Sequence, residues 1–160
     1  MFIDNFIVNF KKELVFNYSN TLAIFILLCF LIFNTYTDLK EYKIYNKSNL
    51  LLIILRLVLY PIFPLSLSNL LGGVFSFIVF IIPAVMFMYR MGGDIKLATV
   101  IGFYLGLYTM PLFIAITLIS AMALGYLIRF IKNKNFNKLP LAPFFLVSHI
   151  VMWILFLIIK

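Results

Sequence analysis

Acidic side chains are scarce in this chain: five Asp and Glu stand against thirteen Lys and Arg in 160 residues. The one Cys and the one His, Cys29 and His149, both lie inside apolar runs. A single Cys excludes an intrachain disulfide and a Cys-based metal site, and we interpret both side chains as packing residues. The sequence also offers no Ser–His–Asp set and no zinc-ligand cluster. We therefore expect neither a metal nor a cofactor.

Polar residues of every kind are few. Hydrophobic residues make up 65% of the chain and charged residues 11%, so a polar face on every helix, which a soluble helical domain needs, cannot be built. Apolar runs such as Leu22–Phe33 do not alternate with polar residues, which excludes an outer-membrane barrel. The composition predicts an all-α integral membrane protein.

The apolar runs predict one membrane-embedded domain over residues 1–160, with a short interfacial helix followed by six transmembrane helices. Near the N-terminus Phe2, Phe6, Phe10 and Leu14 recur at helical spacing, which is typical of a helix lying in the membrane interface over residues 1–19. The six expected spans are about 20–36, 48–63, 67–89, 95–108, 110–131 and 141–159.

The basic residues lie in short loops and predict the orientation. One side collects Lys40, Lys43, Lys47, Arg90, Lys96, Arg129, Lys132, Lys134 and Lys138, and the other holds Lys11, Lys12 and Lys160. By the positive-inside rule the first group faces the cytoplasm and both termini lie outside, in a multi-pass protein of the cell membrane. Because the charges serve orientation in this way, we expect no nucleic-acid partner.

Three of the acids, Asp38, Glu41 and Asp94, fall on the predicted cytoplasmic side. In the simpler interpretation Asp38 caps or closes a turn and Asp94 begins a helix, where backbone N–H groups and the helix dipole favour a carboxylate. The pair Gly92–Gly93 before Asp94 favours a further role. A helix cap needs no such glycines, whereas a close approach of another segment does.

Two carboxyl groups that face each other share one proton, because like charges at close range do not both ionise easily. The ionised member can accept a proton from water that attacks a peptide carbonyl, and the protonated member can donate to the carbonyl oxygen. We therefore take Asp38 and Asp94 as candidate catalytic residues of an aspartic protease.

Three stretches resemble the type IV prepilin peptidases and the archaeal preflagellin peptidases. Residues 37–46 (TDLKEYKIYN) resemble the family's first-aspartate motif, which ends in Ile-Pro-Asn. Residues 92–97 (GGDIKL) resemble its Gly-x-Gly-Asp-x-Lys-Leu motif, and residues 139–144 (LPLAPF) resemble the segment that opens the last helix. The chain departs from these patterns at Tyr45, Met91 and Ala142, which replace Pro, Gly and Gly. The resemblance implies site-supporting roles for Asn46, Gly92, Gly93 and Lys96.

This resemblance implies the substrates and the place of cleavage. They would be prepilin-like or preflagellin-like proteins, cut at the cytoplasmic membrane face where a short basic leader meets an apolar helix. Many bacterial members also methylate the new N-terminus with an additional domain. This chain leaves no room for that domain, so we expect peptidase activity without methyl transfer.

Other residues and functions leave alternatives open. Lys96 either favours ionisation of Asp94 or extends to the lipid headgroups. Arg56 and Glu41 are candidates for charge pairing or substrate contact, although Arg56 can equally neutralise helix-end carbonyls inside the bundle. Gly102 and Gly106 are interpreted as helix-packing residues. The alternative functions are a small ion or proton-coupled transporter, whose acids usually lie near the bilayer midplane, and a non-catalytic pilus or secretion assembly factor.

Overall fold

The computed structural model describes residues 2–86, 92–132 and 140–160. Within these ranges the chain forms seven helices and no strand, which confirms the all-α class. The helices are α1 (Phe2–Ser19), α2 (Thr21–Glu41), α3 (Asn46–Val58), α4 (Leu67–Met86), α5 (Gly92–Leu105), α6 (Met110–Lys132) and α7 (Ala142–Ile159). The end of the third predicted span (87–89) and the predicted roles of Arg90, Met91, Lys134 and Lys138 fall outside the described residues.

Three helices, α2, α4 and α7, are long and apolar enough to cross a membrane, and the first part of α6, Met110–Leu124, is a shorter apolar helix. Large hydrophobic side chains such as Val74, Phe77, Ile82 and Val85 are exposed along α4, as lipid-facing residues are in a membrane protein. The short helices α3 and α5 have 13 and 14 residues, which corresponds to about 20 Å, less than the ~30 Å of a hydrocarbon core. The six-span bundle therefore remains a prediction.

Several helix ends differ from their predicted positions because an apolar run does not end where its helix does. Helix α5 spans Gly92–Leu105, where residues 95–108 were predicted. Helix α2 continues to Glu41, past the predicted end at residue 36, and stops where Tyr42 adopts φ 51°, with its N–H bonded to the Asp38 carbonyl. Helix α3 ends at Val58 instead of residue 63. The residues that follow fold into turns in which the N–H groups of Ile62 and Phe63 bond to the Leu59 carbonyl. Asp38 consequently lies in the last turn of α2, not after it.

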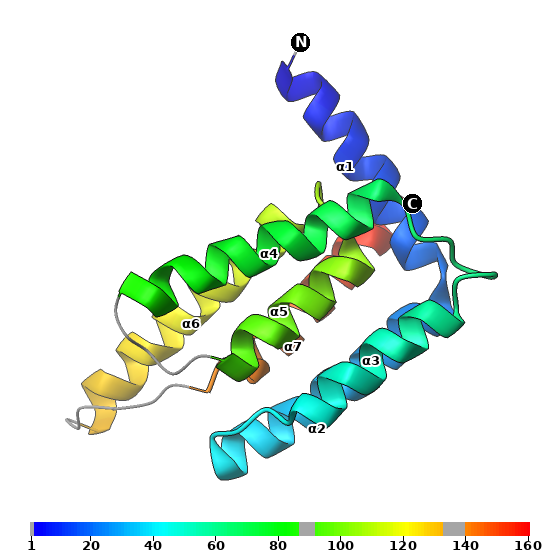
Figure 1. Cartoon of the computed structure of the whole chain (residues 1–160). Helices are drawn as coiled ribbons and strands as arrows, with labels where there is room; N and C mark the ends of the chain where they lie inside the picture. The colour runs from blue at the N-terminus through cyan, green and yellow to red at the C-terminus, as the bar shows by residue number, and fades with distance from the viewer. Residues whose placement is uncertain (1, 87–91, 133–139) are drawn as a thin grey trace.

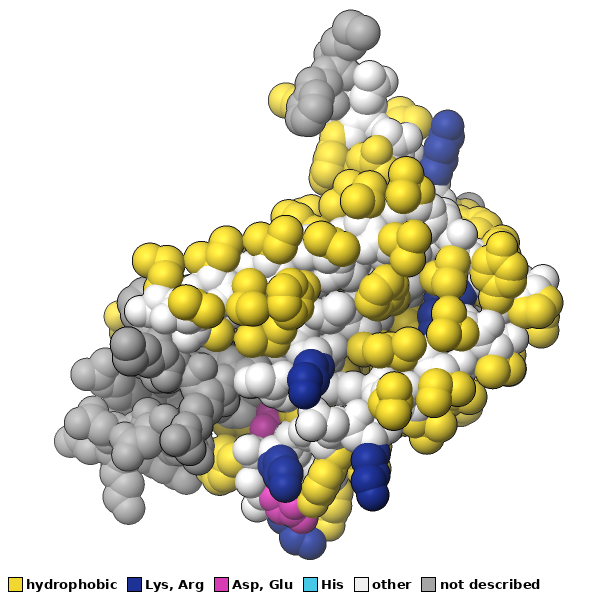
Figure 2. Space-filling model, viewed as in Figure 1, with side chains coloured by type: hydrophobic (Ala, Val, Ile, Leu, Met, Phe, Trp, Pro, Cys, Tyr) yellow, Lys and Arg dark blue, Asp and Glu magenta, His cyan; other side chains and the backbone are white. Residues whose placement is uncertain are grey.

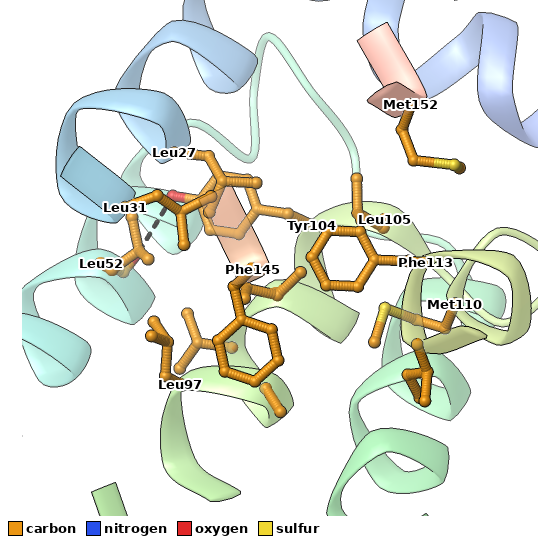
Figure 3. Packing of buried hydrophobic residues seen from close by; sticks show 14 of the residues in the cluster. Leu27, Leu31, Leu52, Leu97, Tyr104, Leu105, Met110, Phe113, Phe145 and Met152 are labelled. Carbon is orange, nitrogen blue, oxygen red and sulfur yellow. Dashed lines mark hydrogen bonds between the residues drawn. The ribbon is translucent and has the colours of Figure 1, made fainter. Parts of the chain in front are cut away.

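The helices pack as neighbours across the chain. Figure 1 shows α4 lying along α5, with α2 and α3 side by side as an antiparallel pair. Helix α7 contacts both α2 and α6, and α3 contacts α5. In the core, shown in Figure 3, Phe113 of α6 stacks on Phe145 of α7, and the Tyr104 hydroxyl of α5 donates to the Leu52 carbonyl of α3 at 3.0 Å. These contacts fix α2, α3, α5 and α7 relative to one another.

Glycines allow α4 and α5 to approach closely. A Cβ atom on Gly72 would lie 2.5 Å from the Gly106 carbonyl carbon and 2.7 Å from the Gly102 carbonyl oxygen. Gly106 also adopts φ +84° and ends α5, a conformation that glycine adopts without strain. The packing role predicted for Gly102 and Gly106 is confirmed.

Helix α1 is anchored to the bundle by its second half. Leu14 and Tyr18 are fully buried, and Figure 1 shows the first turns of α1 extending beyond the other helices. Glu13 holds the helix in place, since its carboxylate accepts the N–H groups of Tyr108 and Thr109, at 2.6 and 3.1 Å, and the Ser68 hydroxyl. An interfacial position for the first half of α1 remains a prediction.

Replacing Glu13 by Ala is expected to lower the free energy of unfolding by about 3 kcal/mol. The change removes charge-assisted hydrogen bonds and leaves the N–H groups before and at the start of α6 without their acceptor. Glu13→Gln keeps one acceptor oxygen and should lose about half as much. Unfolding by SDS titration in mixed micelles measures both variants, and equal stability of Glu13→Ala and wild type would contradict the anchoring role.

Candidate active site

Asp38 is placed by the end of α2 and by the start of α7. Its side chain is 5% exposed, and its Oδ2 accepts the backbone N–H of Ala142 at 2.9 Å. Ala142 is the first residue of α7, where N–H groups lack partners in their own helix and the helix dipole favours negative charge. Ala142, which belongs to the third stretch of the resemblance, thus meets Asp38 of the first-aspartate stretch in space, over a sequence separation of 104 residues.

Asp94 lies in the first turn of α5, where its side chain is half-buried. Gly93 lets the α2–α3 connection reach this turn, because a Cβ atom on Gly93 would lie 3.0 Å from the Ile44 Cβ. A Cβ atom on Gly92 would meet none of the described residues within 4 Å. The predicted close approach of another segment is therefore seen at Gly93 and not at Gly92.

The two aspartates are near enough to interact electrostatically. Asp94 belongs to α5, which is not one of the three helices long and apolar enough to cross a membrane, α2, α4 and α7. Burial and, second, the charge of Asp38 raise the pKa of Asp94 to about 7. A carboxyl group that keeps its proton near neutral pH beside a second carboxylate is the arrangement in which two acids share one proton. The helices that carry them, α2 and α5, are separate in sequence and in contact in space.

Lys96 and Glu41, two charged residues near the aspartates in the sequence, bind neighbouring polar side chains. Lys96 Nζ donates to the Asn46 side-chain oxygen at 3.0 Å and so links α5 to the first residue of α3. The Tyr45 hydroxyl donates to Glu41. On the face shown in Figure 2, acidic side chains lie with Lys and Arg side chains toward the lower end, and hydrophobic side chains cover most of the upper part. The roles predicted for Lys96, Asn46 and Glu41 in a reaction remain predictions.

Arg56 lies apart from the acids. Ten residues of α3 separate it from Asn46, which is about 15 Å along a helix. Its guanidinium is buried, donates to the Phe63 carbonyl at 2.7 Å and lies 4.0 Å from the centre of the Phe63 ring. Phe63 follows the end of α3 at Val58, so the carbonyl that Arg56 contacts belongs to a turn and not to a helix end, and neutralisation of a helix-end carbonyl remains a prediction. Contact with a substrate acid remains a prediction.

Sequence reasoning missed the backbone N–H of Ala142 as a partner of Asp38, because a backbone donor leaves no mark in residue type. It also missed two buried amides, Asn34 and Asn49, which are 0% and 3% exposed. The available signal was spacing: Asn34 precedes Asp38 by one helical turn inside an apolar run. Among the described residues, no group of three or more His, Cys, Asp and Glu side chains is placed to hold a metal ion.

Residues 25–128 match the profile of the type IV leader peptidase family. This segment holds both aspartates and lacks α7 and its N–H donor to Asp38. No curated protein and no solved structure gives a significant match to the chain.

Proposed function

Because this chain belongs to the type IV leader peptidase family, we propose that it is an aspartic endopeptidase with Asp38 and Asp94 as its catalytic pair. Its substrates would be prepilin-like or preflagellin-like proteins, and it would remove their short basic leader. One observation carries the proposal: two acids from distant parts of the chain interact, and the pKa of Asp94 is raised to about 7. The proposal includes peptidase activity without methylation of the new N-terminus.

The surroundings of the two acids support separate roles in the reaction. Burial and, second, the charge of Asp38 raise the pKa of Asp94 to about 7, so we assign the shared proton mainly to Asp94, while Asp38 accepts the Ala142 N–H. Asp38 takes a proton from water as the water oxygen attacks the scissile carbonyl carbon, while Asp94 donates its proton to the carbonyl oxygen. When the C–N bond breaks, the proton on Asp38 passes to the leaving amine and the oxygen returns a proton to Asp94. Both acids end in their starting states.

The proposed topology places this chemistry at the cytoplasmic membrane surface. Asp38 lies in the last turn of α2 and Asp94 in the first turn of α5, at the ends of helices and beside Lys40, Lys43 and Lys96 in the sequence. The predicted positive-inside orientation, six spans and external termini would bring both acids to the point where a basic leader meets an apolar helix. A transporter acid would instead be expected near the midplane of its helix.

Cleavage by the purified protein tests the proposal. The full chain in lipid nanodiscs is incubated with a synthetic substrate that has a basic leader, a Gly at the leader's end and an apolar helix. Mass spectrometry should show two products from one cut at the leader's end. A folded protein that leaves this substrate intact would contradict the proposed function and favour the non-catalytic assembly factor.

The raised pKa of Asp94 predicts a fall in activity above neutral pH. The working pair holds one proton, and this proton is lost as the pH rises through about 7, the value to which the pKa of Asp94 is raised. Above that pH, kcat/KM should fall about tenfold per pH unit. Initial rates at saturating and limiting substrate between pH 5 and 9 measure the alkaline limb, and a flat profile over this range would contradict the shared proton.

A further inference from the structure

Asn34 of α2 and Asn49 of α3 are buried, and their side chains have no hydrogen-bond partner among the described residues. Both atoms of each side-chain amide lack a partner within residues 2–86, 92–132 and 140–160, and the same holds for the Ser48 hydroxyl. Buried polar groups in proteins are normally hydrogen-bonded, so each exception needs a physical reason. Two whole amides without partners in adjacent helices mark this region of the bundle as unusual.

The other buried asparagines of the bundle provide a comparison. Asn17 donates to the Leu105 carbonyl at 2.5 Å. The Asn69 side chain accepts from Ser66 at 2.7 Å and donates to the Tyr104 carbonyl. Both link helices in the way expected of structural amides. Asn34 and Asn49 make no such link among the described residues, so helix packing does not account for them.

Each amide lies about one turn from a residue of the candidate site, Asn34 before Asp38 on α2 and Asn49 after Asn46 on α3. On α2 the buried residues Leu27, Leu31, Asn34 and Asp38 form one inward stripe, and Asn34 lies one turn, about 6 Å, from Asp38. On α3, Asn49 lies three residues beyond Asn46, whose side chain accepts from Lys96. Helix α3 contacts both α2 and α5, so both amides border the region that holds the acids.

A side-chain amide matches a peptide group, because it carries an N–H donor and a carbonyl acceptor. A substrate segment must be extended for two carboxyl groups to reach one of its carbonyls, and its neighbouring N–H and C=O groups then lack partners. In apolar surroundings these groups need partners from the enzyme. An extended chain rises about 3.3 Å per residue, so a site ~6 Å from Asp38 would meet a peptide group about two residues from the scissile bond.

A groove of about 510 Å³ lies between α2 and α3. Its walls are mainly apolar, with Cys29, Phe30, Phe33 and Leu51, and they include Ser48, the neighbour of Asn49. A segment with apolar side chains fits such walls. The two amides do not line the groove themselves, but each directly follows a wall residue, Phe33 or Ser48.

We propose that Asn34 and Asn49 bind the main chain of the substrate just after the scissile bond, where its apolar helix begins and is locally extended. This inference rests on the proposed function, because it assumes that the leader lies at the surface and the apolar helix deeper. Both amides bind any peptide backbone, so they select for an extended segment and not for particular side chains.

The test compares Asn34→Leu and Asn49→Leu with wild type in nanodiscs, using the synthetic substrate and a matched substrate that carries an ester in place of the second peptide bond after the cut. Each Leu variant should raise KM about tenfold with kcat within about threefold of wild type, since one or two hydrogen bonds to substrate are lost. Resistance to SDS should stay equal or rise, because an unpartnered amide is replaced by an apolar group.

The ester substrate distinguishes contact with the main chain from an indirect effect. It removes one N–H donor, so wild type should show a raised KM for it, whereas at least one Leu variant should treat both substrates alike. Lower stability with an unchanged KM, or the same ester effect in wild type and both variants, would overturn the inference while leaving the proposed function intact. Failure of wild type to cleave either substrate would overturn both.

Discussion

Replacing Asp94 by Asn should reduce leader cleavage by about 10³-fold or more, and Asp38→Asn should do the same. Positioned general acids and bases contribute about 10² to 10⁴ in rate, and an amide can neither accept the proton of the attacking water nor donate a carboxylic proton. The measurement is single-turnover cleavage of the synthetic prepilin-like substrate by each purified variant. Residual activity above about 10% in either folded variant would contradict the catalytic pair.

Folding must be separated from chemistry for this result to be informative. The surroundings of each aspartate give a physical reason to expect that its Asn variant folds. Asn at position 38 keeps an oxygen that can accept the Ala142 N–H now bound by Asp38. Asp94→Asn removes a half-buried acid whose ionised form is disfavoured by burial and by Asp38. Both variants should therefore resist SDS about as well as wild type.

A matched control is Asp4→Asn, which removes a carboxylate of the same kind from the first turn of α1. Asp4 is exposed, and the proposed mechanism gives it no part in the reaction. Full activity of this variant beside two inactive ones would assign the loss to the site. A similar loss in all three would indicate a general effect of acidic charge.

The interaction within the pair can be measured without substrate. Because the charge of Asp38 contributes to the raised pKa of Asp94, Asp38→Asn should lower the pKa of Asp94 from about 7. Infrared titration of the carboxyl stretch reports this directly. The resulting shift would show proximity even in a variant that does not turn over.

The sequence predicted the helical class more successfully than it predicted helix ends, and the catalytic pairing of its two distant acids stays a prediction. Long apolar runs directly reflect burial in lipid, so α2, α4 and α7 could be located within a few residues. The end of α2 depends on a local event, the φ of 51° at Tyr42, which neither hydropathy nor charge records. Asp38 was therefore expected after the helix and lies inside it.

Partners in space were less predictable than residue types. The residues of 139–144 were recognised by resemblance, but the donor to Asp38 is a backbone N–H whose position depends on where α7 begins. Glu13 was assigned to an interfacial segment, yet it accepts hydrogen bonds from residues more than ninety positions later. Such contacts arise from helix packing, and a single sequence contains no direct signal for them.

The packing of α4 on α5 supplies the second large expected effect: Gly72→Val should lower the free energy of unfolding by at least about 3 kcal/mol. Overpacking a filled contact costs about 1–3 kcal/mol when side chains can move, and more when they cannot. At Gly72 the obstacles are backbone atoms, since even a Cβ would lie 2.5 Å from the Gly106 carbonyl carbon and 2.7 Å from the Gly102 oxygen. Neither can rotate away, so the helices must separate.

Gly92→Ala is the control, because Gly92 is the first residue of α5 and a Cβ atom there would meet none of the described residues within 4 Å. Its stability should change by less than about 0.5 kcal/mol. SDS unfolding titrations of both variants measure the difference. Native stability of Gly72→Val would mean that α4 and α5 are not packed backbone to backbone in the membrane.

The same substitution should also reduce activity, although Gly72 is remote from the acids. Helix α5 carries Asp94 in its first turn and meets Gly72 at Gly102, eight residues later, which is about 12 Å along the helix. A rigid helix displaced at one end moves at the other, and proton transfer requires hydrogen-bond distances of about 2.6–3.2 Å. Gly72→Ala, which adds one methyl group, should fall between wild type and Gly72→Val in both stability and cleavage rate. If stability falls in this order while the rate per folded molecule stays constant, the α4–α5 contact supports the fold but does not position Asp94.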